Sequence, residues 1–214
     1  MRFEPHTIFH IFNQGNNRQP IFFRPENYLF FLKKMREHLL PHGDLLCYCL
    51  MPNHFHWLFY VREVNVVKPG GGGIPQPGSR SESGGDWQSP PDWAGPGLET
   101  RSLNDSIAIL LRSYTRAINI QQDRSGSLFR KETKAKDGWI EGFIALEGSR
   151  TRPQFWNDYG YTCFQYIHRN PVEARLVRNA QDWPYSSCAD FTGLRNGSLC
   201  NQELARELLN LPDV

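Results

Sequence analysis

One stretch decides the fold, Cys47-Tyr48-Cys49-Leu50-Met51-Pro52-Asn53-His54-Phe55-His56-Trp57-Leu58-Phe59-Tyr60-Val61. Its two apolar runs meet at a Pro-Asn pair, which predicts two short strands joined by a tight turn. Side chains alternate along a strand, so His54 and His56 should project from one face and Phe55 from the other. Two imidazoles on one face are part of a metal site, a catalytic pair, or two polar residues on the wet side of a half-buried sheet.

The residues around the two histidines favour the first of these interpretations. Pro52-Asn53-His54-Phe55-His56 after an apolar strand resembles the histidine–hydrophobe–histidine motif of the single-tyrosine HUH endonucleases, a family that contains the IS200-like and REP-associated tyrosine transposases. A second match to that family lies far downstream, in the stretch Tyr166-Ile167-His168-Arg169-Asn170-Pro171-Val172-Glu173-Ala174. Two separated motifs in the expected order are more specific than either alone. The resemblance covers most of residues 1–67 and 101–194.

The pattern of the chain predicts a single α+β domain over residues 1–214. Strands and helices follow in the order β–α–β–β–α–β and then α, which predicts a ferredoxin-like antiparallel sheet with helices on one face. The expected elements are a strand at 7–13, a helix from Pro25 to about Leu40, the strand pair at 47–61, a helix at 101–122, an edge strand at 128–136, a helix from Asp158 to about Arg169 and a last helix near 202–209. Asn170-Pro171 should end or distort the helix that begins at Asp158, and a short helix from Val172 could follow. The helix from Asp158 carries the tyrosine that the resemblance identifies as catalytic.

Two segments depart from the family pattern. Between residues 69 and 97 lie nine of the chain's 18 glycines and six of its 15 prolines. Such a tract buries too little surface to offset its chain entropy, so we expect a flexible insertion at 68–100 and no second domain. Residues 137–157 lie where the family passes almost directly from strand to helix, and they form a second expected insertion.

Composition narrows the class of protein. The net charge is only +2 and the chain has five cysteines. With an odd number and no Cys-x-x-Cys pair, a disulfide framework or zinc knuckle is not expected, and a reducing compartment fits. No stretch has the apolar length of a spanning helix, so we expect no membrane association. These features predict a cytoplasmic protein, associated with the nucleoid when it is bound to DNA.

The resemblance implies cleavage and strand transfer of single-stranded DNA through a covalent 5′-phosphotyrosine, with a divalent cation, Mg²⁺ or Mn²⁺, as cofactor. His54 and His56 would be two of its ligands. Tyr166 and Asn170 are four residues apart, hence on one helix face, so Asn170 could be the third ligand while Tyr166 attacks. Tyr166 could also be a packed aromatic residue. His168 points elsewhere on that helix and is given no catalytic role.

Two other side chains compete for attention near this site. Tyr114 is the alternative nucleophile, because it lies on the basic helix at 101–122. It also falls on the apolar stripe of that helix, which favours a core position over catalysis. His10 lies on the first expected strand and could face the site, but the sequence does not place it.

A basic segment indicates where DNA would lie. Residues 101–136 contain eight Lys and Arg against three Asp and Glu. Within it we expect DNA contacts from Arg124, Arg130, Lys131, Lys134 and Lys136, as a phosphate backbone requires. The alternative is that this segment is only the solvated face of a helix and strand.

Three functions remain for comparison. The first is the metal-dependent tyrosine transposase, acting on single-stranded or hairpin DNA, as a monomer or homodimer. The second is a hairpin-binding module that has lost catalysis. The third is a zinc hydrolase that uses His54 and His56. No HExxH motif and no further His or Cys at close spacing supports it.

Overall fold

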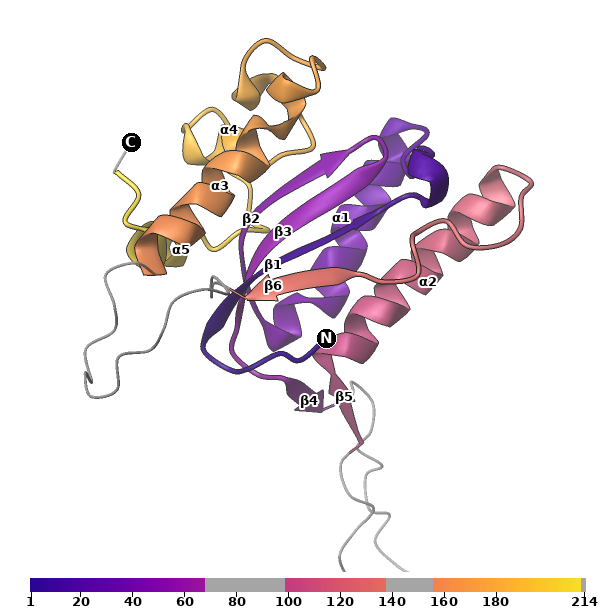
Figure 1. Ribbon diagram of the computed structural model, residues 1–214, viewed down its shortest axis with the longest axis horizontal. Coiled ribbons are helices and arrows are strands. Elements are labelled where there is room, and N and C mark those ends of the chain that lie inside the picture. The colour runs from indigo at the N-terminus through magenta and orange to yellow at the C-terminus, as the bar shows by residue number, and fades with distance from the viewer. Residues whose placement is uncertain (68–98, 138–155, 213–214) are drawn as a thin grey trace, which may run out of the picture.

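A four-stranded antiparallel sheet forms the centre of the molecule (Figure 1). The computed structural model describes residues 1–67, 99–137 and 156–212. The strands lie in the order β2-β3-β1-β6, and every neighbouring pair is antiparallel. Their bounds are β1 Thr7–Gln14, β2 Gly43–Met51, β3 His54–Val61 and β6 Lys134–Asp137. With the helices between them, this is the predicted α+β, ferredoxin-like arrangement, which is confirmed.

Two helices cover one face of the sheet. They are α1, Pro25–His38, and α2, Leu103–Gln121. Phe31 of α1 contacts Phe55 and Trp57 of β3 and Tyr114 of α2, and all four side chains are fully buried. The odd-numbered residues of β3 thus form the floor of the aromatic core, as the alternation around the histidines predicted.

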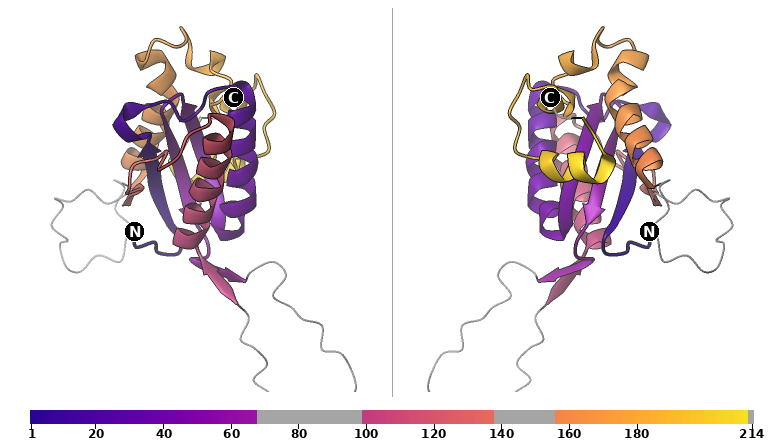
Figure 2. Two further views of the ribbon diagram at one scale, coloured as in Figure 1. Left: turned by 90° about the vertical axis from the view of Figure 1, so that its right-hand side faces the viewer. Right: turned by 90° about the vertical axis from the view of Figure 1, so that its left-hand side faces the viewer.

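A third long helix covers the opposite face, which the expectation of helices on one face did not include. Helix α3, Trp156–Glu173, packs on β2 and β3 (Figure 2). The physical reason is visible in β2, which is buried at every position but one. A strand buried on both faces needs a layer on each side. The tail after α3 completes this layer with α4, Cys188–Phe191, and α5, Gln202–Leu209.

Of the two outcomes expected at Asn170-Pro171, the end of the tyrosine helix there was wrong. Helix α3 continues past Asn170-Pro171 to Glu173. Proline so close to a helix end removes only one backbone hydrogen bond, and the amide of Ala174 still donates to the carbonyl of Asn170 at 2.9 Å. Asn170 is therefore helical, which keeps it on the face of Tyr166.

Two other predicted boundaries shift. The edge strand expected at 128–136 is regular only from Lys134, although Arg130 N donates to the Gln14 carbonyl at 2.9 Å. Buried Leu128 and Phe129 pull this part of the segment toward the core. Helix α1 ends at His38, and a short 3-10 turn, Leu40–His42, follows it.

The first expected insertion begins and ends at a small two-stranded ribbon. Its strands are β4, Asn65–Val67, and β5, Thr100–Ser102, with Val67 paired to Thr100. The chain therefore returns to its starting point across the insertion. The ends of the insertions expected at 68–100 and 137–157 belong to regular elements, with Thr100 in β5, Asp137 in β6 and Trp156 in α3. Residues 68–98 and 138–155, on which the expected flexibility depends, lie outside the described residues.

The cysteines agree with the expectation of no disulfide framework. All five are free and buried. Among the described residues, the helices are too short or too polar to cross a membrane.

Candidate metal and tyrosine site

The sheet face under α3 brings together the two histidines and the tyrosine helix. His54 and His56 project from the same side of β3, with ring centroids 5.1 Å apart. The ring of Tyr166 stands edge-on to His56 at 5.4 Å between centroids. A small cavity of about 240 Å³ opens here, lined by Phe12, Asn13, Gln14, His54, His56, Arg130, Glu132, Lys134 and Tyr166. The residues that the strand period and the helix spacing singled out thus lie close together.

The tautomer of His54 follows from its neighbours. The Asn53 side-chain amide donates to the Arg18 carbonyl at 3.3 Å, so its oxygen faces His54 Nδ1 at 2.6 Å. Nδ1 must therefore carry the hydrogen and donate it to Asn53. In the neutral ring Nε2 is then left with a lone pair.

Asn170 presents an oxygen to that lone pair. Its amide nitrogen donates to the Tyr166 carbonyl at 2.8 Å, which turns Oδ1 toward His54 Nε2 at 3.5 Å. Two acceptors facing each other make no hydrogen bond. Two ligands of one cation, each at about 2.1 Å and roughly at right angles, lie about 3 Å apart, so this pair fits a shared cation.

A third histidine is hydrogen-bonded to His56. His10 of β1 and His56 are joined by a hydrogen bond of 2.9 Å between His10 Nε2 and His56 Nδ1. If His56 Nδ1 donates, His56 Nε2 keeps its lone pair and His10 Nδ1 faces Cys163 Sγ at 3.9 Å. The reverse arrangement would make His56 Nε2 a donor, unable to bind a cation. A ligating His56 therefore requires His10 as acceptor.

Burial keeps these imidazoles neutral. The pKa of His56 is lowered well below its usual value by burial and by the adjacent His10 and His54. The pKa of His10 is lowered by burial and by Lys136, and that of His54 by burial, against a smaller opposing effect of Asn170. Neutral imidazole is the form that binds metal ions.

The two candidate nucleophiles lie in opposite environments. The Tyr166 side chain is 44% exposed at the cavity. Tyr114 is 0% exposed on the far side of the sheet, where its hydroxyl donates to the Ile21 carbonyl at 2.7 Å. Its pKa is raised by burial and by Tyr28, so the structure places Tyr114 in the core.

The five predicted DNA-binding cations divide into two groups. Arg130 and Lys134 line the small cavity, and Lys136 pairs in register with His10. Residues opposite each other in antiparallel strands share a face, so Lys134, opposite Phe12, and Lys136 lie on the histidine face. Arg124 and Lys131 line a neighbouring, larger cavity instead.

Sequence reasoning left Asn53 without a role and His10 unplaced. Asn53 was visible as the residue before the first histidine, but its function depends on the loop that carries Arg18. His10 needed the strand register, which pairs Phe12 with His56 and so brings the next even-numbered residue of β1 onto the same face. His168, given no catalytic role, is buried and bonded to Ser187 Oγ at 2.8 Å.

The candidate ligands are His54, His56 and the amide oxygen of Asn170. No cluster of three or more His, Cys, Asp or Glu with ligand geometry occurs in residues 1–67, 99–137 and 156–212. The candidate set therefore depends on a neutral amide oxygen as its third donor. Nitrogen and neutral oxygen donors with few charges leave coordination positions for the anionic oxygens of a phosphate.

Comparisons with known proteins give one structural likeness. A solved structure of a REP-associated tyrosine transposase bound to a REP hairpin aligns over 94% of both chains, with a TM-score of 0.49 and 11% sequence identity. It carries the name of the family that the sequence motifs resemble. No protein-family model and no curated protein matches the chain. Likeness of this degree transfers no residue role, so each role below rests on the geometry of this chain.

Proposed function

We propose that the protein is a metal-dependent tyrosine transposase that cleaves and rejoins single-stranded DNA at hairpin or palindromic sequences. The observation that carries the proposal is the half-exposed Tyr166 ring in one cavity with His54 and His56, where Asn170 Oδ1 lies 3.5 Å from His54 Nε2. One helix turn supplies both the nucleophile and a ligand. A protonated His54 would donate to both Asn53 and Asn170, but burial lowers the pKa of His54, which favours the neutral ring and a cation shared with Asn170.

In the proposed reaction, Tyr166 Oη forms a bond to a backbone phosphorus while the bond from phosphorus to the 3′ oxygen breaks. The phenolic proton leaves to solvent, which reaches the exposed ring, and the departing 3′ oxygen takes up a proton. The product is a 5′-phosphotyrosine, and attack by another 3′ hydroxyl reverses the step and joins strands.

His54, His56 and Asn170 would hold Mg²⁺ or Mn²⁺. A bound divalent cation supplies polarisation of the phosphate and stabilisation of its developing charge. Asn53 and His10 orient the two imidazoles, while Arg130 and Lys134 at the cavity attract and position the anionic backbone.

The test is a denaturing gel of end-labelled hairpin DNA from the locus after incubation with protein and Mn²⁺ or Mg²⁺. We expect a covalent protein–DNA band that disappears with a chelator. His56→Ala and Asn170→Ala should lose the band but retain most hairpin binding, because the phosphate contacts remain. Binding with no adduct under any of these metals would instead indicate a hairpin-binding module without catalysis.

A further inference from the structure

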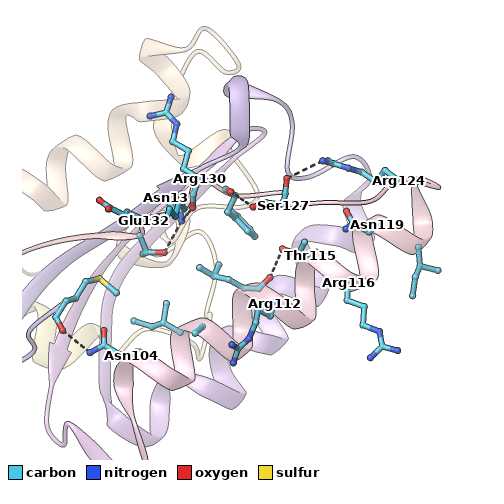
Figure 3. Close-up of a pocket in the computed structure, with 18 of the residues that line it drawn as sticks. Asn13, Asn104, Arg112, Thr115, Arg116, Asn119, Arg124, Ser127, Arg130 and Glu132 are labelled. Carbon is cyan, nitrogen blue, oxygen red and sulfur yellow. Dashed lines mark hydrogen bonds between the residues drawn. The ribbon is translucent and has the colours of Figure 1, made fainter.

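A large cavity lies between α2 and the segment that leads into β6 (Figure 3). Its volume is about 1420 Å³. We call it the α2 groove. Its lining consists of Met1, Asn13, Asn104, Ile107, Ala108, Leu111, Arg112, Thr115, Arg116, Asn119, Ile120, Asp123, Arg124, Ser127, Phe129, Arg130, Lys131, Glu132 and Thr133.

One flank of α2 builds a wall of the groove. Asn104, Ala108, Arg112, Arg116 and Ile120 follow each other at intervals of four residues, which places them in one row along a helix. The stripe that contains Tyr114 faces α1 and the sheet. The row from Asn104 to Ile120 therefore does not pack in the core.

The charge of the groove favours an anionic occupant. Five cations, Arg112, Arg116, Arg124, Arg130 and Lys131, line it against two acids, Asp123 and Glu132. In the described ranges no ion pair joins any of these cations to a carboxylate. The Arg124 guanidinium only donates to the Ser127 carbonyl, at 3.4 Å.

The groove also offers apolar surface. Leu111 and Phe129 line it, and Ile120 is 75% exposed. The Asn119 side-chain oxygen is buried without a hydrogen-bond partner, although the amide nitrogen of Asn119 donates to the Gly126 carbonyl at 2.8 Å. Cations beside apolar surface suit a strand that offers both phosphates and unpaired bases. A duplex would present its phosphates and groove edges but no free base faces.

The groove is continuous with the tyrosine site. Asn13, Arg130 and Glu132 line both cavities. Asn13 fixes the segment between them, because its amide nitrogen donates to the Arg130 carbonyl at 3.3 Å and to Thr133 Oγ1 at 2.9 Å. A strand leaving Tyr166 past Arg130 would reach the groove around this edge of the sheet.

We propose that the α2 groove binds the unpaired strand that flanks the cleaved phosphodiester. Arg112 and Arg116 contact its phosphates, and the bases lie against Leu111 and Ile120. This assignment rests on the proposed function and adds a separate binding surface to it. Arg112 and Arg116 become binding residues that lie outside the cation set predicted from the sequence.

The test is fluorescence anisotropy with Tyr166→Phe protein, so that no probe is cleaved. The probes are a stem-loop, the same stem-loop with a single-stranded extension, the extension alone, and its duplex. In this parent protein, Tyr166→Phe, the extended stem-loop should bind more tightly than the bare stem-loop. Arg112→Gln combined with Arg116→Gln should remove most of that gain and leave the bare stem-loop unaffected. The log–log salt slope for the extended probe should fall by about 1.4, since each single-strand phosphate contact contributes about 0.7.

Lys33→Gln is the matched control, because Lys33 is an exposed cation on α1 away from the groove. It should change neither affinity nor slope. If the double variant binds the extended stem-loop as well as the parent does, or if duplex binds as well as the single strand, the groove assignment is overturned. If the parent binds no stem-loop, the proposed function fails. The isolated extension then still tests the groove assignment, because its affinity must be lower for the double variant than for the parent protein.

Discussion

At the scale of single residues, the candidate site depends on which nitrogen carries a hydrogen. Asn53 fixes the hydrogen of His54 on Nδ1 through a contact of 2.6 Å. His10 can do the same for His56 across 2.9 Å. Partners of this kind orient metal-binding histidines, and their loss costs about 10–100-fold in metal affinity. A sequence motif that names only the two histidines therefore describes half of the arrangement.

His10 provides a test that does not depend on activity. Gln can accept a hydrogen bond from His56 Nδ1, whereas Phe cannot. We expect His10→Phe to weaken Mn²⁺ binding by about tenfold or more, as measured by calorimetry, and His10→Gln to retain most of it. Melting temperatures of both variants control for packing. Equal Mn²⁺ affinities in two folded variants would show that His10 does not orient His56.

At the scale of elements, strand alternation and helix stripes predicted β1, α1, β2, β3 and α2, but not the ribbon strands β4 and β5. These patterns are local, and each reports which face of an element is buried. The position of α3 could not be predicted from such a local pattern, because it depends on the burial of both faces of β2. A sharper reading of Cys47 to Met51 as a continuous apolar run would have indicated a second covering layer.

The expected site residues divide in the same way. The pairing of His54 with His56, and of Tyr166 with Asn170, follows from periods of two and of about four. The participation of His10 depends on strand register, and that of Asn53 on a loop. The alternative in which Pro171 ends the helix fails, because the amides of the last turn find other acceptors and a proline there removes only one backbone hydrogen bond.

Helix α3 should make stability depend on pH through His168. This side chain is buried and bonded to Ser187, and burial lowers its pKa to about 3. Unfolded histidine has a pKa of about 6.5. Between these values only the unfolded state binds the proton, so the free energy of unfolding should fall as pH drops from about 6.5 toward 3.

The size of this effect is testable by urea unfolding at several pH values. One such group contributes a slope of at most about 1.4 kcal/mol per pH unit. His168→Gln keeps a polar partner for Ser187 and cannot be protonated. Its unfolding free energy should decline less steeply below pH 6 than that of the parent. Parallel declines in parent and variant would mean that His168 is protonated in the folded protein.

At the scale of the whole molecule, the described residues form one layered domain with the first insertion rooted in a ribbon. Val67 and Thr100 are paired neighbours. A short linker can therefore join the two strands without moving either. The pairing of the two chain segments continues beyond the ribbon, since Leu103 N at the start of α2 donates to the Val64 carbonyl at 2.8 Å.

Replacing residues 69–97 with a short linker should leave thermal stability almost unchanged. Each halving of a loop changes its closure free energy by only about 0.6 kcal/mol. In a protein of this size, a change in closure free energy of this order corresponds to a few degrees in Tm. Calorimetric melting of the shortened and full chains measures the difference. A fall of more than about 10 °C would show that the deleted segment stabilises the domain.

The central claim is that Tyr166 is the nucleophile of a metal-dependent DNA cleavage. The most direct measurement is mass spectrometry of the purified protein–DNA adduct after protease and nuclease digestion, which identifies the residue that carries the nucleotide. Tyr161→Phe and Tyr114→Phe are the controls, one an exposed tyrosine of the same helix and the other the buried alternative. We predict a phosphonucleotide on Tyr166, retained in both controls and absent in Tyr166→Phe. A nucleotide found on Tyr114, Tyr161 or any other residue would contradict the proposed site.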